Sequence, residues 1–242
     1  MLSQKYLNCV QQILNEIGKT QSDAIGQAAD IVAAAIAGGG KLFLFGTGHS
    51  HILAEEAFYR AGGLVHVNPI LEPALMLHEG PFKSTEMERL EGYAQIILDH
   101  SGIGPGDVLM IISNSGRNAV PVEMAVIAKN LGIPVIVLTS LTHSRSVPSR
   151  HSGGKHLFEV ADVVIDNCGV HGDAVLNVDC STVQVQICPT STVAGALIIN
   201  MLVAEVVERF CAMGLEPAVF RSANVDGGDE FDRKWEKALV SR

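Results

Sequence analysis

Short apolar segments alternate with amphipathic ones along this chain, and the alternation limits the folds that it can adopt. Two of the apolar segments, 41–45 and 107–112, run into turns rich in glycine and serine, and each turn leads into a helical pattern. Strands that alternate with helices at this spacing favour a parallel sheet, because parallel neighbours need a long crossover between them. We therefore expect a doubly wound α/β fold with helices on both faces of the sheet.

Hydrophobic periodicity predicts the individual elements. Helices are expected around 7–17, 24–36, 51–60, 85–99, 120–131 and 191–213. Strands are expected at 41–45, 64–68, 107–112, 134–138 and 161–165. Because no linker interrupts the pattern, we expect a single domain over 1–242, with N-terminal helices at 1–40, a core at 41–213 and a tail at 214–242.

Composition narrows the possible partners and the compartment. The chain has 242 residues and a formal net charge of −9, which disfavours a general nucleic-acid surface. Its five cysteines are scattered, which favours reduced thiols. The longest apolar stretch, 193–204, is interrupted by Asn200 and is shorter than the ~20 residues of a membrane span. We expect a cytoplasmic protein with no membrane or nucleic-acid partner.

The two turns, 46–50 (GTGHS) and 113–118 (SNSGRN), lie where open parallel sheets bind ligands, beyond the carboxyl ends of strands. Each turn precedes a helix, so backbone N–H groups and the positive end of the helix dipole meet there. Glycines permit close backbone approach, and serine hydroxyls donate hydrogen bonds to phosphate oxygens. The turns therefore indicate an anion site, best suited to a phosphate monoester.

Other ligands fit these turns less well. A dinucleotide fingerprint needs a third glycine where His51 stands, and an acidic residue near Asn68 at the end of the second strand. No Walker A sequence follows either strand. His49 and His51 form an H-x-H pair, but the spacing supplies no further ligands for a metal. We expect neither a cofactor nor a metal.

Together the turns resemble the two phosphate-binding loops of the sugar isomerase (SIS) family, over roughly residues 30–213. The resemblance implies a flavodoxin-like, three-layer αβα sandwich with a five-stranded parallel sheet, and a phosphosugar ligand. It also implies a homodimer or homotetramer with shared active sites. The residues that it assigns to the phosphate are Gly48, Ser50, Ser113, Ser115, Gly116 and Asn118, the last in place of the usual threonine.

The family includes aldose–ketose isomerases, muramic acid 6-phosphate etherases and sugar-phosphate-sensing domains. Isomerisation requires a base that moves a proton between adjacent carbons. Glu79 lies in a segment similar to the one that carries a catalytic glutamate in the etherases, and His78 and Glu56 are further candidates. Phosphoheptose isomerases have a glutamate where this chain has Arg60, and a histidine in the final helix, which has none here. We expect a metal-independent isomerase, with an etherase or lyase and a non-catalytic sensing module as alternatives.

Secondary candidates surround the two turns. The candidate residues for contact with the sugar are Thr47, His49, Asn114, Ser191 and Thr192. Ser191 and Thr192 are equally explained as N-terminal caps of the final helix. The histidines and arginines at 142–156 lie among serines and glycines, which predicts either a mobile surface loop or a flap that brings positive charge to an anion.

Overall fold

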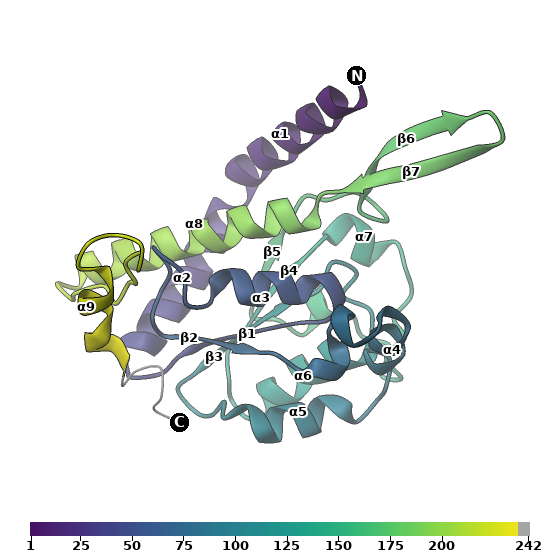
Figure 1. Cartoon of the computed structure of the whole chain (residues 1–242). Coiled ribbons are helices and arrows are strands. Elements are labelled where there is room, and N and C mark those ends of the chain that lie inside the picture. The colour runs from purple at the N-terminus through teal and green to yellow at the C-terminus, as the bar shows by residue number, and fades with distance from the viewer. Residues whose placement is uncertain (237–242) are drawn as a thin grey trace.

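The computed structural model describes residues 1–236 and contains a five-stranded parallel sheet in the order β2-β1-β3-β4-β5 (Figure 1). The strands are β1 (Leu42–Gly46), β2 (Val67–Ile70), β3 (Val108–Ile112), β4 (Val135–Thr139) and β5 (Val163–Asp166). This strand order is that of flavodoxin-like folds, in which the chain reverses direction across the sheet between β1 and β3. The expected sheet is confirmed.

Side chains along the strands alternate between two helical layers. Leu42 and Leu44 of β1 point into a core shared with α2 (Ser22–Ala37), α3 (His51–Ala57) and α8 (Ser191–Ala212). Phe43 and Phe45 point into the opposite core, beneath α5 (Tyr93–Ser101) and α6 (Ala119–Asn130). Because both faces are covered, the central strands β1 and β3 are buried along their whole length and carry no polar side chain, and the three-layer sandwich is confirmed.

A helix and a hairpin project together beyond the sheet (Figure 1). The helix is α1 (Leu2–Thr20), and the hairpin joins β6 (Ala174–Cys180) to β7 (Val183–Pro189) in an antiparallel pair. The Tyr6 hydroxyl donates to the Pro189 carbonyl at 2.8 Å, which ties the helix to the hairpin. The sequence pattern did not predict this hairpin, although residues alternate between apolar and polar along both of its strands.

Two expected elements are wrong. The single helix over 85–99 is two helices, α4 (Pro81–Met87) and α5, because Gly92 adopts a left-handed conformation with φ of 85° between them. The strand expected at 64–68 begins only at Val67. The residues before it pair instead with the C-terminal segment, where Leu64 forms an antiparallel bridge with Val219.

The C-terminal segment packs on the domain, and is more than the surface tail that its composition suggests. Ala218 and Phe220 are buried against Val65, with Trp235 beside them. The short helix α9 (Gly228–Asp232) follows within this segment. The last part of the predicted tail, 237–242, lies outside the described residues.

The segment 142–156, expected to be either a mobile surface loop or a flap, is tied by hydrogen bonds to the turn that follows β3. It begins in the short helix α7 (Leu141–Arg145). Further on, the Arg150 amide donates to the Arg117 carbonyl at 2.8 Å, and the Leu157 amide donates to the Gly116 carbonyl at 2.8 Å. The segment therefore runs along the turn that follows β3.

In the described part of the chain, α8 alone is long and apolar enough to cross a membrane, with a mean hydropathy of 1.6. Length and composition are the only properties behind this finding, and core helices share them. One side of α8 is buried against α2 and α3, through residues such as Ile198, Leu202 and Val206. The buried share of this apolar stretch is 33%, on the side that packs within the sandwich.

Candidate functional site

The turn after β1, residues 46–50, is called loop 1 here. A Cβ atom on Gly46 would lie 2.6 Å from the carbonyl carbon of Ser50, so glycine is needed for the chain to fold back over the end of the strand. The Ser50 amide donates to the Thr47 carbonyl at 3.1 Å, which closes a short helical turn that leads into α3. Loop 1 thus places the start of α3 directly at the carboxyl end of β1.

The turn after β3, residues 113–118, is called loop 2. Its shape is fixed by internal and neighbouring hydrogen bonds. The Gly116 amide donates to the Ser113 hydroxyl at 3.2 Å, and the Asn114 side-chain oxygen accepts from the Asn167 amide group at 2.8 Å. Loop 2 is therefore held from within and from the end of β5.

Glu88, which the sequence pattern did not single out, joins the two loops. Its two carboxylate oxygens accept from the Thr47 hydroxyl and the Asn118 side-chain amide, each at 2.8 Å. Burial raises the pKa of Glu88, and these two hydrogen bonds oppose that rise. Arg150 donates to the side-chain oxygen of Asn118 at 2.9 Å. The Asn118 side chain is thus engaged by protein groups on both sides.

A cleft lies between loop 1, loop 2 and the start of α8, at the point where the strand order reverses. We call it the loop cleft; its lining residues are His49, Ser50, Leu53, Ile112, Asn114, Leu138, Asn167, Ser191 and Thr192. Five predicted site residues from three separate elements meet in it, whereas Ser113, Ser115 and Gly116 lie on loop 2 outside the lining set. The cavity measures only about 10 Å³, close to the room needed by one water molecule.

Asp173 caps α8 at the edge of this cleft, and the sequence pattern did not single it out. Its carboxylate accepts from the Ser191 amide at 2.8 Å and from the Ser191 hydroxyl at 2.5 Å, and it also accepts from the Thr190 amide at 2.9 Å. The predicted cap residues are therefore at the helix start, but the capping group comes from the residue before the hairpin.

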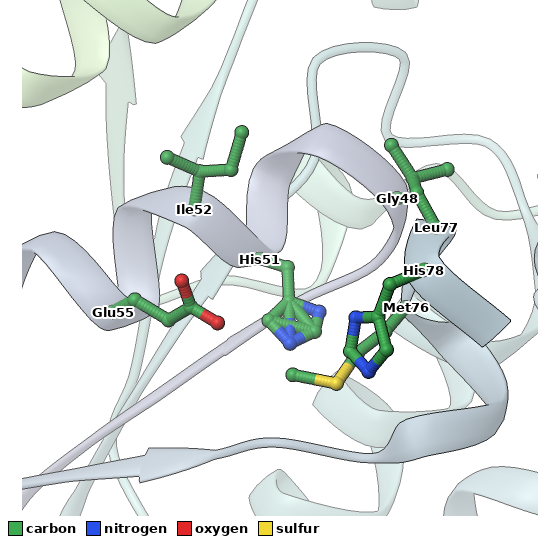
Figure 2. Close-up of a pocket in the computed structure, with 7 residues that line it drawn as sticks. All are labelled: Gly48, His51, Ile52, Glu55, Met76, Leu77 and His78. Carbon is green, nitrogen blue, oxygen red and sulfur yellow. The ribbon is translucent and has the colours of Figure 1, made fainter.

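A second pocket, of about 240 Å³, lies beside the start of α3. Figure 2 shows the residues that line it. We call it the α3 pocket; its lining residues are Gly48, His51, Ile52, Glu55, Met76, Leu77 and His78. His51, Ile52 and Glu55 come from the first half of α3, and Gly48 comes from the short turn that precedes it. The other wall comes from the connection between β2 and α4.

His51 is the most unusual side chain of this pocket. Its residue is only 4% exposed, and neither ring nitrogen has a hydrogen-bond partner among the described residues. Burial lowers the pKa of His51, the nearby Glu55 carboxylate partly opposes this, and His78 adds to the lowering. The ring is therefore neutral at pH 7, and it can act as both a donor and an acceptor.

The three predicted catalytic residues occupy different surroundings. His78 lines the α3 pocket. Glu79 is exposed and faces Lys83, with 3.5 Å between the carboxylate oxygen and the ammonium nitrogen, and Glu56 forms an ion pair with Arg60. Within residues 1–236, no group of three or more histidine, cysteine or acidic side chains is arranged to hold a metal ion. Catalytic roles for these residues stay predictions.

Comparison with known proteins gives the family. Residues 5–140 match the family described as SIS domain. The chain belongs to the SIS domain family. A UPF0309 protein of Halalkalibacterium halodurans is 47% identical to this SIS protein over 228 residues, which cover 94% of the chain and 90% of that relative.

Solved structures agree with this fold. The SIS chain superimposes on the phosphoheptose isomerase of Neisseria gonorrhoeae with a TM-score of 0.55 and 17% identity, covering 86% of this chain and 100% of that one. It superimposes on the Vibrio vulnificus NanR protein complexed with ManNAc-6P with a TM-score of 0.52 and 14% identity, covering 100% and 71%. At these identities the likeness establishes the fold alone.

Proposed function

We propose that this SIS protein binds a phosphosugar at the loop cleft and interconverts its aldose and ketose forms by metal-independent proton transfer. The observation that supports this most is the meeting of Ser50 and Asn114, from two separate strand-to-helix turns, in one cleft at the reversal of the strand order. Two of the fold's neighbours, a phosphoheptose isomerase and a protein complexed with ManNAc-6P, handle phosphosugars. A phosphosugar ligand fits the chemistry of the two turns and is the ligand class of these two neighbours.

In this proposal the phosphate lies at the mouth of the loop cleft, between loop 1 and loop 2. The groups that hold it are Gly48, Ser50, Ser113, Ser115 and Gly116, through hydroxyls and backbone amides. Arg150 supplies local positive charge, because its side chain is fixed on Asn118 beside loop 2. Such a local charge is needed in a chain whose formal net charge is −9. Asn118 thus acts through Arg150 and Glu88 to position loop 2.

Proton transfer at the sugar then requires a base near the opposite end of the ligand. His78 is the best placed of the predicted residues, because it lines the α3 pocket beside loop 1. Glu79 follows His78 directly in the chain. Its carboxylate can reach the sugar only if its ion pair with Lys83 breaks. We further propose a single domain over 1–242 that assembles with a second copy to complete the site.

The first test is thermal stabilisation by sugar phosphates, each paired with its free sugar. A ligand at 100 times its dissociation constant adds about 2.7 kcal/mol to the stability of the folded state. We expect a rise in melting temperature with a phosphorylated sugar only. Turnover is then followed by proton NMR in deuterium oxide, where an enediol mechanism exchanges the hydrogen next to the carbonyl group. No shift with any phosphosugar would contradict the binding proposal.

A non-catalytic sensing module is the second candidate. It is favoured by the surface ion pairs that engage Glu79 and Glu56, two of the three residues expected to move protons. A sensor would give the same thermal shift with no hydrogen exchange and no product. An etherase or lyase would instead release a second product from a phosphosugar ether, which the same NMR experiment detects.

A further inference from the structure

The outward face of α8 is apolar, and the single chain leaves it uncovered. The inner side of the helix packs on α2 and α3, yet only 33% of its most apolar stretch is buried. Figure 1 shows α8 along the upper edge of the molecule, with α1 and the hairpin beyond its start. A helix that is apolar on all sides is normally covered on all sides, so the outward face of α8 needs a cover.

The uncovered residues of α8 recur at alternating intervals of four and three. They form a line along the outward face, which we call the α8 stripe: Val193, Leu197, Asn200, Ala204 and Val207. Val193, Asn200 and Ala204 are exposed, and the other two are half-buried. A mean interval of 3.5 residues is that of the seam between two packed helices. None of the five carries a charge, although the chain has a formal net charge of −9.

We propose that the α8 stripe packs against the α8 stripe of a second copy of this chain, with the two helices antiparallel about a two-fold axis at Asn200. This inference rests on the proposed assembly with a second copy and names the surface that forms it. It does not depend on which ligand the loop cleft binds.

The α8 stripe complements itself when its direction is reversed. Asn200 is its middle member, so an antiparallel pair places this residue opposite its own copy. Leu197 then faces Ala204 of the partner subunit, a large side chain against a small one, and Val193 faces Val207 of the partner subunit. A surface that matches itself about a two-fold axis forms a closed dimer.

Asn200 supplies the polar contact at the centre of this seam. Its side-chain amide donates to the Ala196 carbonyl at 2.8 Å, and its side-chain oxygen has no partner among the described residues. Across the axis, that oxygen can accept from the amide of Asn200 of the partner subunit. One polar residue in an apolar seam fixes the register of two helices. Against lipid tails the same amide would be costly, which favours a helix as the occupant over a membrane.

Charge sets the orientation of the two helices. Glu208 is exposed beside the last member of the stripe, so parallel helices would bring two such carboxylates together. Antiparallel helices separate them to opposite ends of the seam. Arg209 forms ion pairs with Glu205 and Asp30 within the chain, so these groups bring no unpaired charge to the contact.

The α1 helix and the hairpin extend the same contact. Leu7 of α1 is 46% exposed and Val183 of β7 is 54% exposed, on segments that project beyond the start of α8 (Figure 1). A two-stranded hairpin has little stability alone, so a partner surface would stabilise it. In the antiparallel pair, the C-terminal half of the partner's α8 lies over this start. Because Ser191 and Thr192 line the loop cleft, the second copy comes to the rim of the site.

Sedimentation equilibrium of the full-length protein, over a wide range of concentration, tests the contact. We expect a dimer in the wild type. Ala204→Glu places a charge in the seam from an exposed position, and should raise the dimer dissociation constant about thirtyfold or more. Ile96→Glu, at an exposed apolar residue of α5 in the opposite helical layer, is the matched control and should dimerise like the wild type.

The outcomes separate the inference from the proposed function. A dimer that survives Ala204→Glu would overturn the inference and leave assembly with a second copy intact. A monomer at every concentration would overturn both, while titration with phosphosugars reports on ligand binding independently. Monomers that bind phosphatidylglycerol vesicles through the stripe would assign this face to a membrane and also overturn the inference.

Disulfide trapping tests the position of the axis. Facing Cα atoms of two closely packed helices lie within reach of a disulfide. We expect mild oxidation to link the subunits of Asn200→Cys well above the wild-type level, which accounts for the native cysteines. Val193→Cys lies on the same stripe but faces Val207 of the partner subunit, so it should not exceed that level. Links in both variants would indicate parallel helices, links in neither would place the contact elsewhere, and either result would overturn the inference.

Discussion

Loop 1 and loop 2 share a place in the fold but differ in how they are held. Loop 2 is fixed by Ser113, by Asn167 from the end of β5, and by the segment that carries Arg150. Loop 1 has a short helical turn and the Thr47–Glu88 hydrogen bond, and beside it the His51 ring lacks a described partner. A rigid loop suits a constant group such as phosphate, and a less constrained one suits the variable part of a ligand.

This difference suggests that the two turns recognise different parts of the ligand. Preorganised donors hold an anion without losing conformational entropy on binding. A polar group without a partner, in contrast, contributes most to the binding free energy when the ligand supplies its hydrogen-bond partner. Loop 2 should therefore determine affinity for the phosphate, and the loop 1 side should determine which sugar is accepted.

The largest effect is expected from Glu88→Ala, which breaks the connection between the loops. It leaves the buried Thr47 hydroxyl and the buried Asn118 amide without their acceptor, at about 1–3 kcal/mol per group. We expect the free energy of unfolding to fall by about 2–4 kcal/mol, and phosphosugar affinity to fall with it. Urea unfolding and calorimetry measure the two effects. Glu88→Gln keeps one acceptor oxygen and should retain part of the stability and part of the phosphosugar affinity. Wild-type stability and affinity in Glu88→Ala would show that the two loops are held independently of Glu88.

Gly116→Ala tests the rigidity of loop 2 alone. Gly116 has φ of 56°, and a Cβ there would lie 2.9 Å from the Ser144 hydroxyl. A non-glycine residue in the left-handed region costs about 1–2 kcal/mol. We expect a loss of stability of that size and weaker phosphate binding. Gly172→Ala also has a positive φ, 73°, with open space around the added atom, so it reports the backbone cost without the contact.

Ser115→Ala addresses the anion directly, with a smaller expected effect. Loss of one hydroxyl donor to a charged phosphate should weaken phosphosugar binding about tenfold, or ~1.4 kcal/mol, with unchanged stability. Ser181→Ala, at the exposed turn of the β6–β7 hairpin, is the control. Unaltered affinity in the Ser115 variant would remove this residue from the phosphate site.

The parallel sheet and the position of the two turns were predictable from the residues, because segments such as 42–46 are apolar and run into glycine-rich turns, while the five strands and the flavodoxin-like order were implied by the SIS resemblance. The pairing of Leu64 with Val219 was not, since it joins segments far apart in the sequence. Glu88 shows the same limit at the site. Its role depends on a helix that ends one residue earlier, and nothing in its local sequence distinguishes it from a surface glutamate. Local periodicity therefore predicts elements, while contacts between distant segments decide what each polar residue does.

His51→Asn gives the smallest effect and tests the other half of the comparison. Because burial lowers the pKa of His51, the unfolded chain binds a proton near pH 6.5 that the folded protein resists. Unfolding stability should therefore decrease as the pH falls below about 6.5, and His66 and His143, whose pKa values are also lowered, add to this slope. Removing the imidazole should make the decrease shallower, as measured by urea unfolding between pH 7.5 and 5.5. His100→Asn, at an exposed position on α5, should retain the wild-type slope. Equal slopes in the wild type and the His51 variant would mean that the ring is solvated and already partnered, and loop 1 would then be as fully satisfied as loop 2.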